Sequence, residues 1–276
     1  MEIDYSQLEC YKACPRKYYN KYKQCLRKQV EDIRDVDTKF GKAIHSGLEE
    51  FYKTWTLEPM YAGFLKHFSV NFKGENVKTV EHGLKALELY YNQYVLQDKD
   101  FEILDTEVFD SVILDNGIKY LVKIDLVFKH MNNVYFMDHK TTGRLTPHWW
   151  DNFDLSSQLT GYTYYTKKKY GQCSGGWVNA INVGFRSRKY KDEPAGFYCK
   201  FERDIFNRNK EQIENWEREL LIWTDRLTND KDFPMTTSSC SNYRGCSFKQ
   251  LCVSVYDESL MDSMYETYDP IAYLTD

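Results

Sequence analysis

An acidic residue and a lysine, Asp138 and Lys140, stand two positions apart at the end of the apolar segment Val134–Met137. In an extended chain, residues two apart point to the same side, so these two charges share one face. Another carboxylate, Asp125, lies in the preceding apolar segment, and across a short hairpin it can approach Asp138. Because unpaired carboxylates repel, the pattern predicts a divalent cation with hard oxygen ligands, Mg²⁺ or Mn²⁺.

A dication beside a lysine is suited to phosphodiester hydrolysis. The metal polarises the phosphodiester and makes a bound water more acidic. Lys140 orients that water or stabilises the charge that develops on phosphorus. An acidic residue and a lysine two apart also recur by chance in a chain with 28% charged residues. The prediction therefore depends on the elements that position the three side chains.

The spacing of apolar side chains predicts an α/β order of elements. Helical spacing near the N-terminus gives way to three strands joined by turns at 115–117 and 131–133, followed by a helix, two strands and a polar helix. The predicted helices cover residues 5–14 with Ser6 as N-cap, 40–55, 79–96, 154–170 and 205–227, and the predicted strands cover residues 102–114, 118–128, 134–137, 176–185 and 196–201.

These motifs resemble the PD-(D/E)xK nuclease superfamily in its RecB-like branch. That branch has a helical His in Gly-x-x-x-His, then Asp, then Asp/Glu-x-Lys, then Gln-x-x-x-Tyr on a helix. This chain matches in the same order with Gly41–His45, Asp125, Asp138–Lys140 and Gln158–Tyr162. The resemblance implies a restriction-endonuclease-like core, which is a mixed central sheet flanked by helices, with a helical insertion.

The resemblance also implies a role for each motif. Gln158 and Tyr162 would contact the substrate strand or brace the lysine. Glu107 occupies the position of an acid often found early in the first strand of this branch, and Lys123 replaces a common glycine. The implied metal ligands are His45, Asp125, Asp138 and the backbone carbonyl of His139, and the implied catalytic residues are Lys140, Asp125, Asp138 and His45.

The cysteines predict a second metal site. Eight cysteines without a secretory signal favour thiols or a metal over disulfides. Cys240, Cys246 and Cys252 are evenly spaced, and Cys14 in Ala-Cys-Pro-Arg-Lys is the natural fourth ligand, for which Cys10 could substitute. This resembles the iron-sulfur subset of the branch, which includes the AddB subunit of bacterial helicase-nucleases and a CRISPR-adaptation nuclease, although the usual spacing there is uneven. A 4Fe–4S cluster joining the N- and C-terminal segments is implied, and structural Zn²⁺ is the alternative.

Charge restricts the kind of nucleic-acid contact. A net charge of −4 does not indicate a broad basic surface for duplex DNA, so we expect any nucleic-acid contact to be local. Basic residues interleaved with tyrosines suit single-stranded DNA, whose bases stack on rings, although such runs are also typical of solvated helix faces. The basic groups are Arg16, Lys17, Lys21, Lys23, Arg27, Lys28, Lys167–Lys169 and Arg186–Lys191.

We therefore expect a divalent-metal-dependent DNA exonuclease that acts on single strands or DNA ends. The alternative is a catalytically silent, cluster-stapled DNA-binding subunit of a recombination or CRISPR-adaptation complex, against which the intact Lys140 argues. With no helicase motif, unwinding would come from a partner. With no membrane span or secretory signal, a cytoplasmic location is the default expectation.

The expected organisation is one nuclease domain over residues 1–276. Its acidic C-terminal tail could be a disordered end, a partner-docking element or a brake that competes with DNA. The expected segments are 1–40 with the first cluster cysteine, a helical region at 41–100, the nuclease core at 101–202, a C-terminal helix and cysteine segment at 203–252, and the acidic tail at 253–276.

Overall fold

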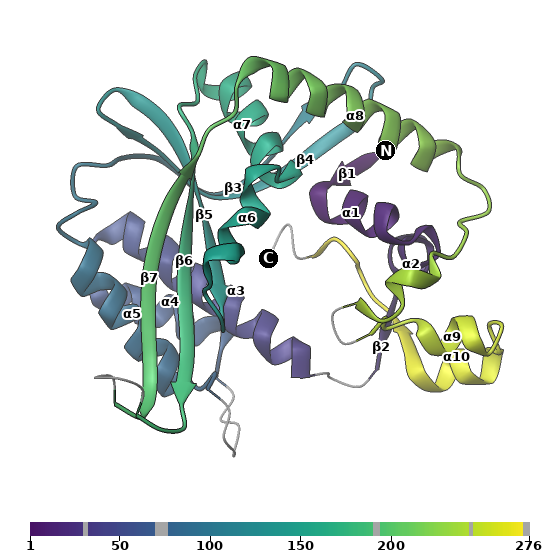
Figure 1. Ribbon diagram of the computed structural model, residues 1–276, viewed down its shortest axis with the longest axis horizontal. Coiled ribbons are helices and arrows are strands. Elements are labelled where there is room, and N and C mark those ends of the chain that lie inside the picture. Colours follow the sequence, from purple (N-terminus) through teal and green to yellow (C-terminus); the bar gives the residue numbers. More distant parts are fainter. Residues whose placement is uncertain (30–32, 70–76, 190–193, 243–244, 273–276) are drawn as a thin grey trace. The chain divides into compact units, whose positions relative to one another are not determined.

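The computed structural model describes residues 1–29, 33–69, 77–189, 194–242 and 245–272 (Figure 1). The chain forms two compact units. Unit 1 comprises residues 1–32, 109–122 and 214–276, and unit 2 comprises residues 33–108 and 123–213. The expectation of one nuclease domain stays a prediction. No helix in the described ranges is long and apolar enough to cross a membrane.

Unit 2 is built on a mixed sheet in which β4, β5, β6 and β7 are neighbours in that order and β3 pairs with β4. The β4–β5 and β6–β7 pairs are antiparallel, whereas β5 and β6 are parallel. A parallel pair needs a crossover, which the helices α6 and α7 provide (Figure 1). The strands are β3 (Glu102–Ile113), β4 (Lys119–His130), β5 (Asn133–Thr142), β6 (Gly176–Arg186) and β7 (Gly196–Phe206).

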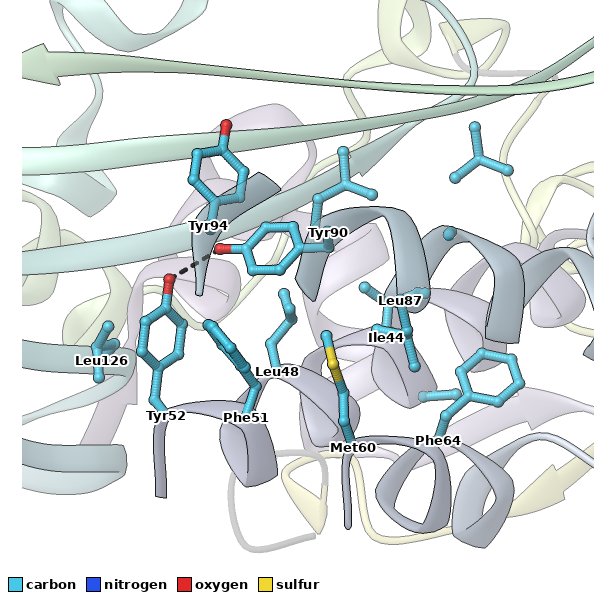
Figure 2. Packing of buried hydrophobic residues seen from close by; sticks show 14 of the residues in the cluster. Ile44, Leu48, Phe51, Tyr52, Met60, Phe64, Leu87, Tyr90, Tyr94 and Leu126 are labelled. Carbon is cyan, nitrogen blue, oxygen red and sulfur yellow. Dashed lines mark hydrogen bonds between the residues drawn. The ribbon is translucent and has the colours of Figure 1, made fainter. Parts of the chain in front are cut away.

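Helices cover both faces of this sheet. The apolar stripe of α3, which includes Ile44, Leu48 and Phe51, is fully buried because its residues recur at helical spacing. Figure 2 shows this stripe packed against Leu87 and Tyr90 of α5. The helices of unit 2 are α3 (Ile33–Thr54), α4 (Leu57–His67), α5 (Val80–Tyr94), α6 (Pro147–Asp154) and α7 (Ser157–Tyr170).

Unit 1 contains both ends of the chain. β1 pairs in parallel with the start of β4, and β2 pairs antiparallel with β8, so N- and C-terminal segments share a small sheet. Leu26, Phe248, Leu251 and Tyr265 form a hydrophobic cluster in this unit. Its elements are β1 (Glu2–Asp4), α1 (Tyr5–Ala13), α2 (Pro15–Tyr18), η1 (Tyr19–Lys23), β2 (Leu26–Lys28), η2 (Thr237–Ser239), α9 (Lys249–Val253), α10 (Glu258–Met264), β8 (Tyr265–Thr267) and most of α8 (Lys210–Asn229).

The predicted elements were found with several corrections. Asp4, not Ser6, caps α1, because its carboxylate accepts the amide hydrogen of Gln7. The helices α4 and α6 were missed, and the helix predicted over 154–170 is α7, which begins three residues later, at Ser157. Residues 205–206 belong to β7, so the long helix begins later, at Lys210.

The acidic tail is ordered over much of its length. Residues 258–264 form α10 and residues 265–267 form β8. The alternative of a disordered end is therefore wrong for these residues, while docking and braking stay untested. The predicted basic group at 186–191 extends to Tyr190 and Lys191, which lie outside the described residues.

Candidate active site

Two aspartates meet where the β4–β5 hairpin ends its regular pairing. Leu126 pairs with Met137, and the next residues along the two strands are Asp125 and Asp138. Both side chains are buried. Asp125 Oδ2 accepts the main-chain N–H of His139 at 2.6 Å. This bond ties one carboxylate directly to the backbone of the Asp-x-Lys motif.

His45 approaches the same carboxylate from α3. Its Nδ1 lies 3.2 Å from Asp125 Oδ1. One turn earlier, Gly41 lies against β5, and a Cβ there would come within 3.1 Å of Thr141 Oγ1. The glycine thus allows the helix to pack closely enough for His45 to reach Asp125.

Glu107 completes a group of three donors. Ligand atoms of His45, Glu107 and Asp125 all lie within 4.8 Å of one another. Glu107 has φ +48° although it lies in β3, and a non-glycine residue in this region is strained and often functional. Lys123, which replaces the expected glycine, places its Nζ 3.7 Å from Glu107 Oε2 and so offsets part of the local negative charge.

Burial and mutual repulsion shift the pKa values of these carboxyl groups. Burial, reinforced by Asp125, raises the pKa of Glu107 to about 7. Although burial opposes it, the contact with His45 holds the pKa of Asp125 below its usual range. Asp125 in turn raises the pKa of His45 against the effect of burial. The negative charges of Glu107 and Asp125 repel each other, and a bound cation would relieve this repulsion.

Asp138 is paired with the lysine of its own motif, and its predicted role as a metal ligand stays a prediction. Its oxygens lie 3.1 and 2.8 Å from Lys140 Nζ, and it is not in the group of three donors. Burial raises the pKa of Asp138, which Lys140 opposes. Lys140 also donates to Gln158 Oε1 at 3.1 Å, while its side chain stays 30% exposed. The ammonium group is thus held by two partners and still reaches solvent.

Gln158 and Tyr162 brace the lysine from α7. Gln158 Nε2 donates to the Tyr162 hydroxyl at 2.9 Å, and that hydroxyl donates to the carbonyl of Lys123 on β4. The two residues are four apart on one helix, so both face the sheet. Of the two predicted roles, bracing Lys140 is the one that these contacts provide.

The donors fit a hard dication. Two carboxylates and one imidazole converge, which is a donor set that Mg²⁺ or Mn²⁺ accepts. Sequence reasoning overlooked one nearby contact, between Asn179 Nδ2 and His139 Nδ1 at 2.8 Å. A polar residue inside the otherwise apolar stretch 176–185 was the available signal.

The four predicted cluster cysteines all belong to unit 1. Burial raises the pKa of the Cys252 thiol, contact with Tyr256 opposes this, and electrostatic interaction with Cys246, Cys14 and Cys240 raises it further. Among the described residues no three of the four sulfur atoms lie within 4.8 Å of one another, and the cluster stays a prediction.

Several solved structures are similar to this chain, and two of them are described as exonucleases. A candidate exonuclease from Eubacterium rectale is 14% identical, with 86% of this chain and 89% of that chain covered and a TM-score of 0.51, and so shares the fold. The alkaline exonuclease LHK-Exo from Laribacter hongkongensis is 12% identical over 71% of this chain and 93% of that chain, with a TM-score of 0.26. No curated protein matches. The sequence model of the PD-(D/E)XK nuclease superfamily matches residues 3–253, and the chain therefore belongs to that superfamily.

Proposed function

We propose that this protein is a divalent-metal-dependent DNA nuclease of the RecB-like branch, acting as an exonuclease on single strands or DNA ends. One observation carries the proposal. His45, Glu107 and Asp125 converge within 4.8 Å beside an ion pair between Asp138 and Lys140. The fold shared with a candidate exonuclease supports the same activity.

Each residue has a distinct task in the proposed reaction. His45, Glu107 and Asp125 would hold Mg²⁺ or Mn²⁺, with Asp138 and the His139 carbonyl as further ligands. When bound, the metal supplies Lewis-acid polarisation of the phosphodiester and a more acidic water.

Lys140 acts from beside this group. Held by Asp138 and Gln158, its ammonium group orients the attacking water or stabilises negative charge at phosphorus. Because these contacts fix the ammonium before substrate arrives, little reorganisation is needed during reaction.

One contact between a cation and an aromatic ring supports a single-stranded substrate. In unit 2, the Arg186 guanidinium lies 3.9 Å from the centre of the half-buried Tyr198 ring. A ring and a cation at one place suit a base and a phosphate of a single strand. A partner that unwinds DNA, such as a helicase or a recombination or CRISPR-adaptation complex, would supply this substrate.

The same proposal includes a 4Fe–4S cluster on Cys14, Cys240, Cys246 and Cys252, with structural Zn²⁺ as the alternative. Cysteine thiolates are ligands of both groups, so the ligand type alone leaves both open.

A buried amide near the cysteines is consistent with the cluster. Asn20 is fully buried, and its Nδ2 has no hydrogen-bond partner in the described structure. Its Oδ1 accepts from Tyr256, which also contacts Cys252. Hydrogen bonds to the sulfur atoms help to set the reduction potential of such clusters. The Asn20 amide could donate a hydrogen bond of this kind.

Incubation of anaerobically purified protein with end-labelled single- and double-stranded DNA tests the nuclease proposal. We expect degradation that requires Mg²⁺ or Mn²⁺, stops with a chelator and is lost in Lys140→Ala. Lys85→Ala, which removes an exposed lysine paired with Glu88, should retain full activity. DNA binding without cleavage in either metal would overturn the enzyme proposal and favour the DNA-binding subunit.

A further inference from the structure

A buried ion pair in unit 2 is joined to His139 through Asn179. Arg203 of β7 donates from Nη1 and Nη2 to the two carboxylate oxygens of Asp98, at 2.7 and 2.8 Å. Their side chains are only 10% and 2% exposed. A two-point pair of this kind has fixed geometry. A chain of hydrogen bonds connects this pair through Asn179 to His139 at the proposed metal site.

The donors of Arg203 fix the orientation of Asn179. Arg203 Nε donates to Asn179 Oδ1 at 3.1 Å, and a guanidinium can only donate. The amide oxygen of Asn179 must therefore face Arg203. Its Nδ2 then faces the other way and donates to the Tyr90 hydroxyl at 3.0 Å and to His139 Nδ1 at 2.8 Å. Since Nδ1 accepts, the proton of the neutral His139 ring lies on Nε2.

The two tyrosine hydroxyls complete this network in one direction. Tyr52 donates to Asp98 Oδ2 at 2.9 Å. Its hydroxyl hydrogen is thereby used, so in the 2.8 Å contact drawn in Figure 2 the donor is Tyr90. Arg203 Nη2 lies 3.1 Å from the Tyr52 oxygen and 2.7 Å from the Tyr90 oxygen, and its two hydrogens are shared among these oxygens and Asp98 Oδ2. The polar groups of this hydrogen-bond network, from Arg203 to Asp98, all have partners. A buried network whose hydrogen bonds are all satisfied is rigid.

The network ends at the main chain of the metal site. The His139 ring is held at Nδ1 by Asn179 and stacks on Tyr52, with ring centres 5.9 Å apart and planes 10° apart. The main-chain N–H of the same residue donates to Asp125 Oδ2. The residue whose ring Asn179 holds is thus the same residue whose main-chain N–H donates to Asp125, and His139 and Asn179 are partners in the β5–β6 pairing.

We propose that Asn179, oriented by the Arg203–Asp98 pair, is a positioning residue for the metal site. It holds His139 in the Nε2–H tautomer and keeps the residue-139 amide on Asp125, so that Asp125 presents its other oxygen beside His45. The inference rests on the proposed function, because Asp125 is a ligand only if the site binds metal. Partners that orient a ligand typically change metal affinity by about 10- to 100-fold.

The tautomer can be measured in the unaltered protein. Nitrogen-15 NMR of histidine-labelled protein, with the His139 signals assigned by loss in His139→Gln, should show a proton on Nε2 and none on Nδ1. A proton on Nδ1 would overturn the proposal, whatever the behaviour of any Asn179 variant.

Substitution tests the link to the metal. In Asn179→Leu the Kd for Mn²⁺, measured by electron paramagnetic resonance without DNA, should rise about tenfold, and the single tautomer should be lost. The matched control is Asn182→Leu, which alters another buried amide of β6, bonded to the Thr142 carbonyl at 3.0 Å. It should keep the Mn²⁺ affinity and the tautomer.

The two outcomes that contradict the positioning role are distinct from failure of the nuclease proposal. An Asn179→Leu protein that binds Mn²⁺ within twofold of the original, or an equal loss in Asn182→Leu, would reduce the network to a general contribution to stability. Absence of DNA cleavage, with Mn²⁺ binding and tautomer as expected, would count against the nuclease proposal alone.

Discussion

Replacing Glu107 by glutamine should stabilise the metal-free protein while weakening metal binding. Burial and Asp125 raise the pKa of Glu107 from 4.5 to about 7. At 1.36 kcal/mol per pH unit, keeping this carboxylate ionised in the folded state costs up to about 3 kcal/mol above pH 7. Its side chain is 22% exposed, and solvent reduces the expected gain from glutamine to about 1–2 kcal/mol.

The sign of the pH dependence follows from the direction of the shift. Because the folded pKa of Glu107 lies above the unfolded value, its destabilising effect is present above about pH 7 and disappears as the pH falls towards 4.5. The advantage of Glu107→Gln should therefore be largest at pH 8 and vanish near pH 4.

Denaturant unfolding with a chelator present, at pH 8 and pH 4, measures this difference. Glu102→Gln is the matched control, since Glu102 lies on the same strand with an exposed side chain and only a 3.6 Å contact to Lys129. It should change stability by less than about 0.5 kcal/mol. Adding Mn²⁺ should stabilise the original protein more than Glu107→Gln. The prediction is wrong if Glu107→Gln is less stable than the original protein at pH 8, or if Mn²⁺ stabilises the two proteins equally.

Three further changes have defined outcomes. Gly83→Ala should lower the free energy of unfolding by about 1–3 kcal/mol, because its Cβ would come within 2.1 Å of the buried Phe64 ring; chemical denaturation measures this. Tyr162→Phe removes the hydroxyl that joins Gln158 to β4 and should reduce kcat about tenfold in the DNA degradation assay. Cys252→Ser should lose the broad visible absorption of an iron-sulfur cluster, as seen in spectra of anaerobic preparations.

Each of these has a control or a contradicting result. Gly143→Ala, at a position with nothing within 4 Å, should be nearly neutral, and equal destabilisation would contradict the packing argument. An unchanged kcat in Tyr162→Phe would remove the bracing role. Cys173→Ser should retain the colour, whereas a colourless original protein with stoichiometric zinc would replace iron-sulfur by zinc.

The site residues that could be predicted from the sequence are those that lie close together on one hairpin or on one helix. Asp125, Asp138 and Lys140 lie on one hairpin, where side-chain alternation and register determine which residues meet. Gln158 and Tyr162 are four apart on one helix, and Gln158 contacts both Lys140 and the Tyr162 hydroxyl. Their proximity therefore follows from local periodicity.

Features that depend on distant partners were not predictable. Asp98 and Arg203 are far apart in sequence and meet only because α5 and β7 pack together, which no local pattern encodes. The closeness of Glu107 to the donors depends on its left-handed backbone within a strand, where a pattern predicts extended structure. At the first helix, Asp4 and Ser6 were both acceptable caps, and only the backbone geometry selects Asp4.

The most direct test of the account is the position of Mn²⁺ in crystals grown or soaked with the metal, located by its anomalous scattering. We expect one strong peak within coordination distance of His45, Glu107 and Asp125. A peak at another group of side chains, or none at saturating Mn²⁺, would contradict the proposal that these three residues bind the metal.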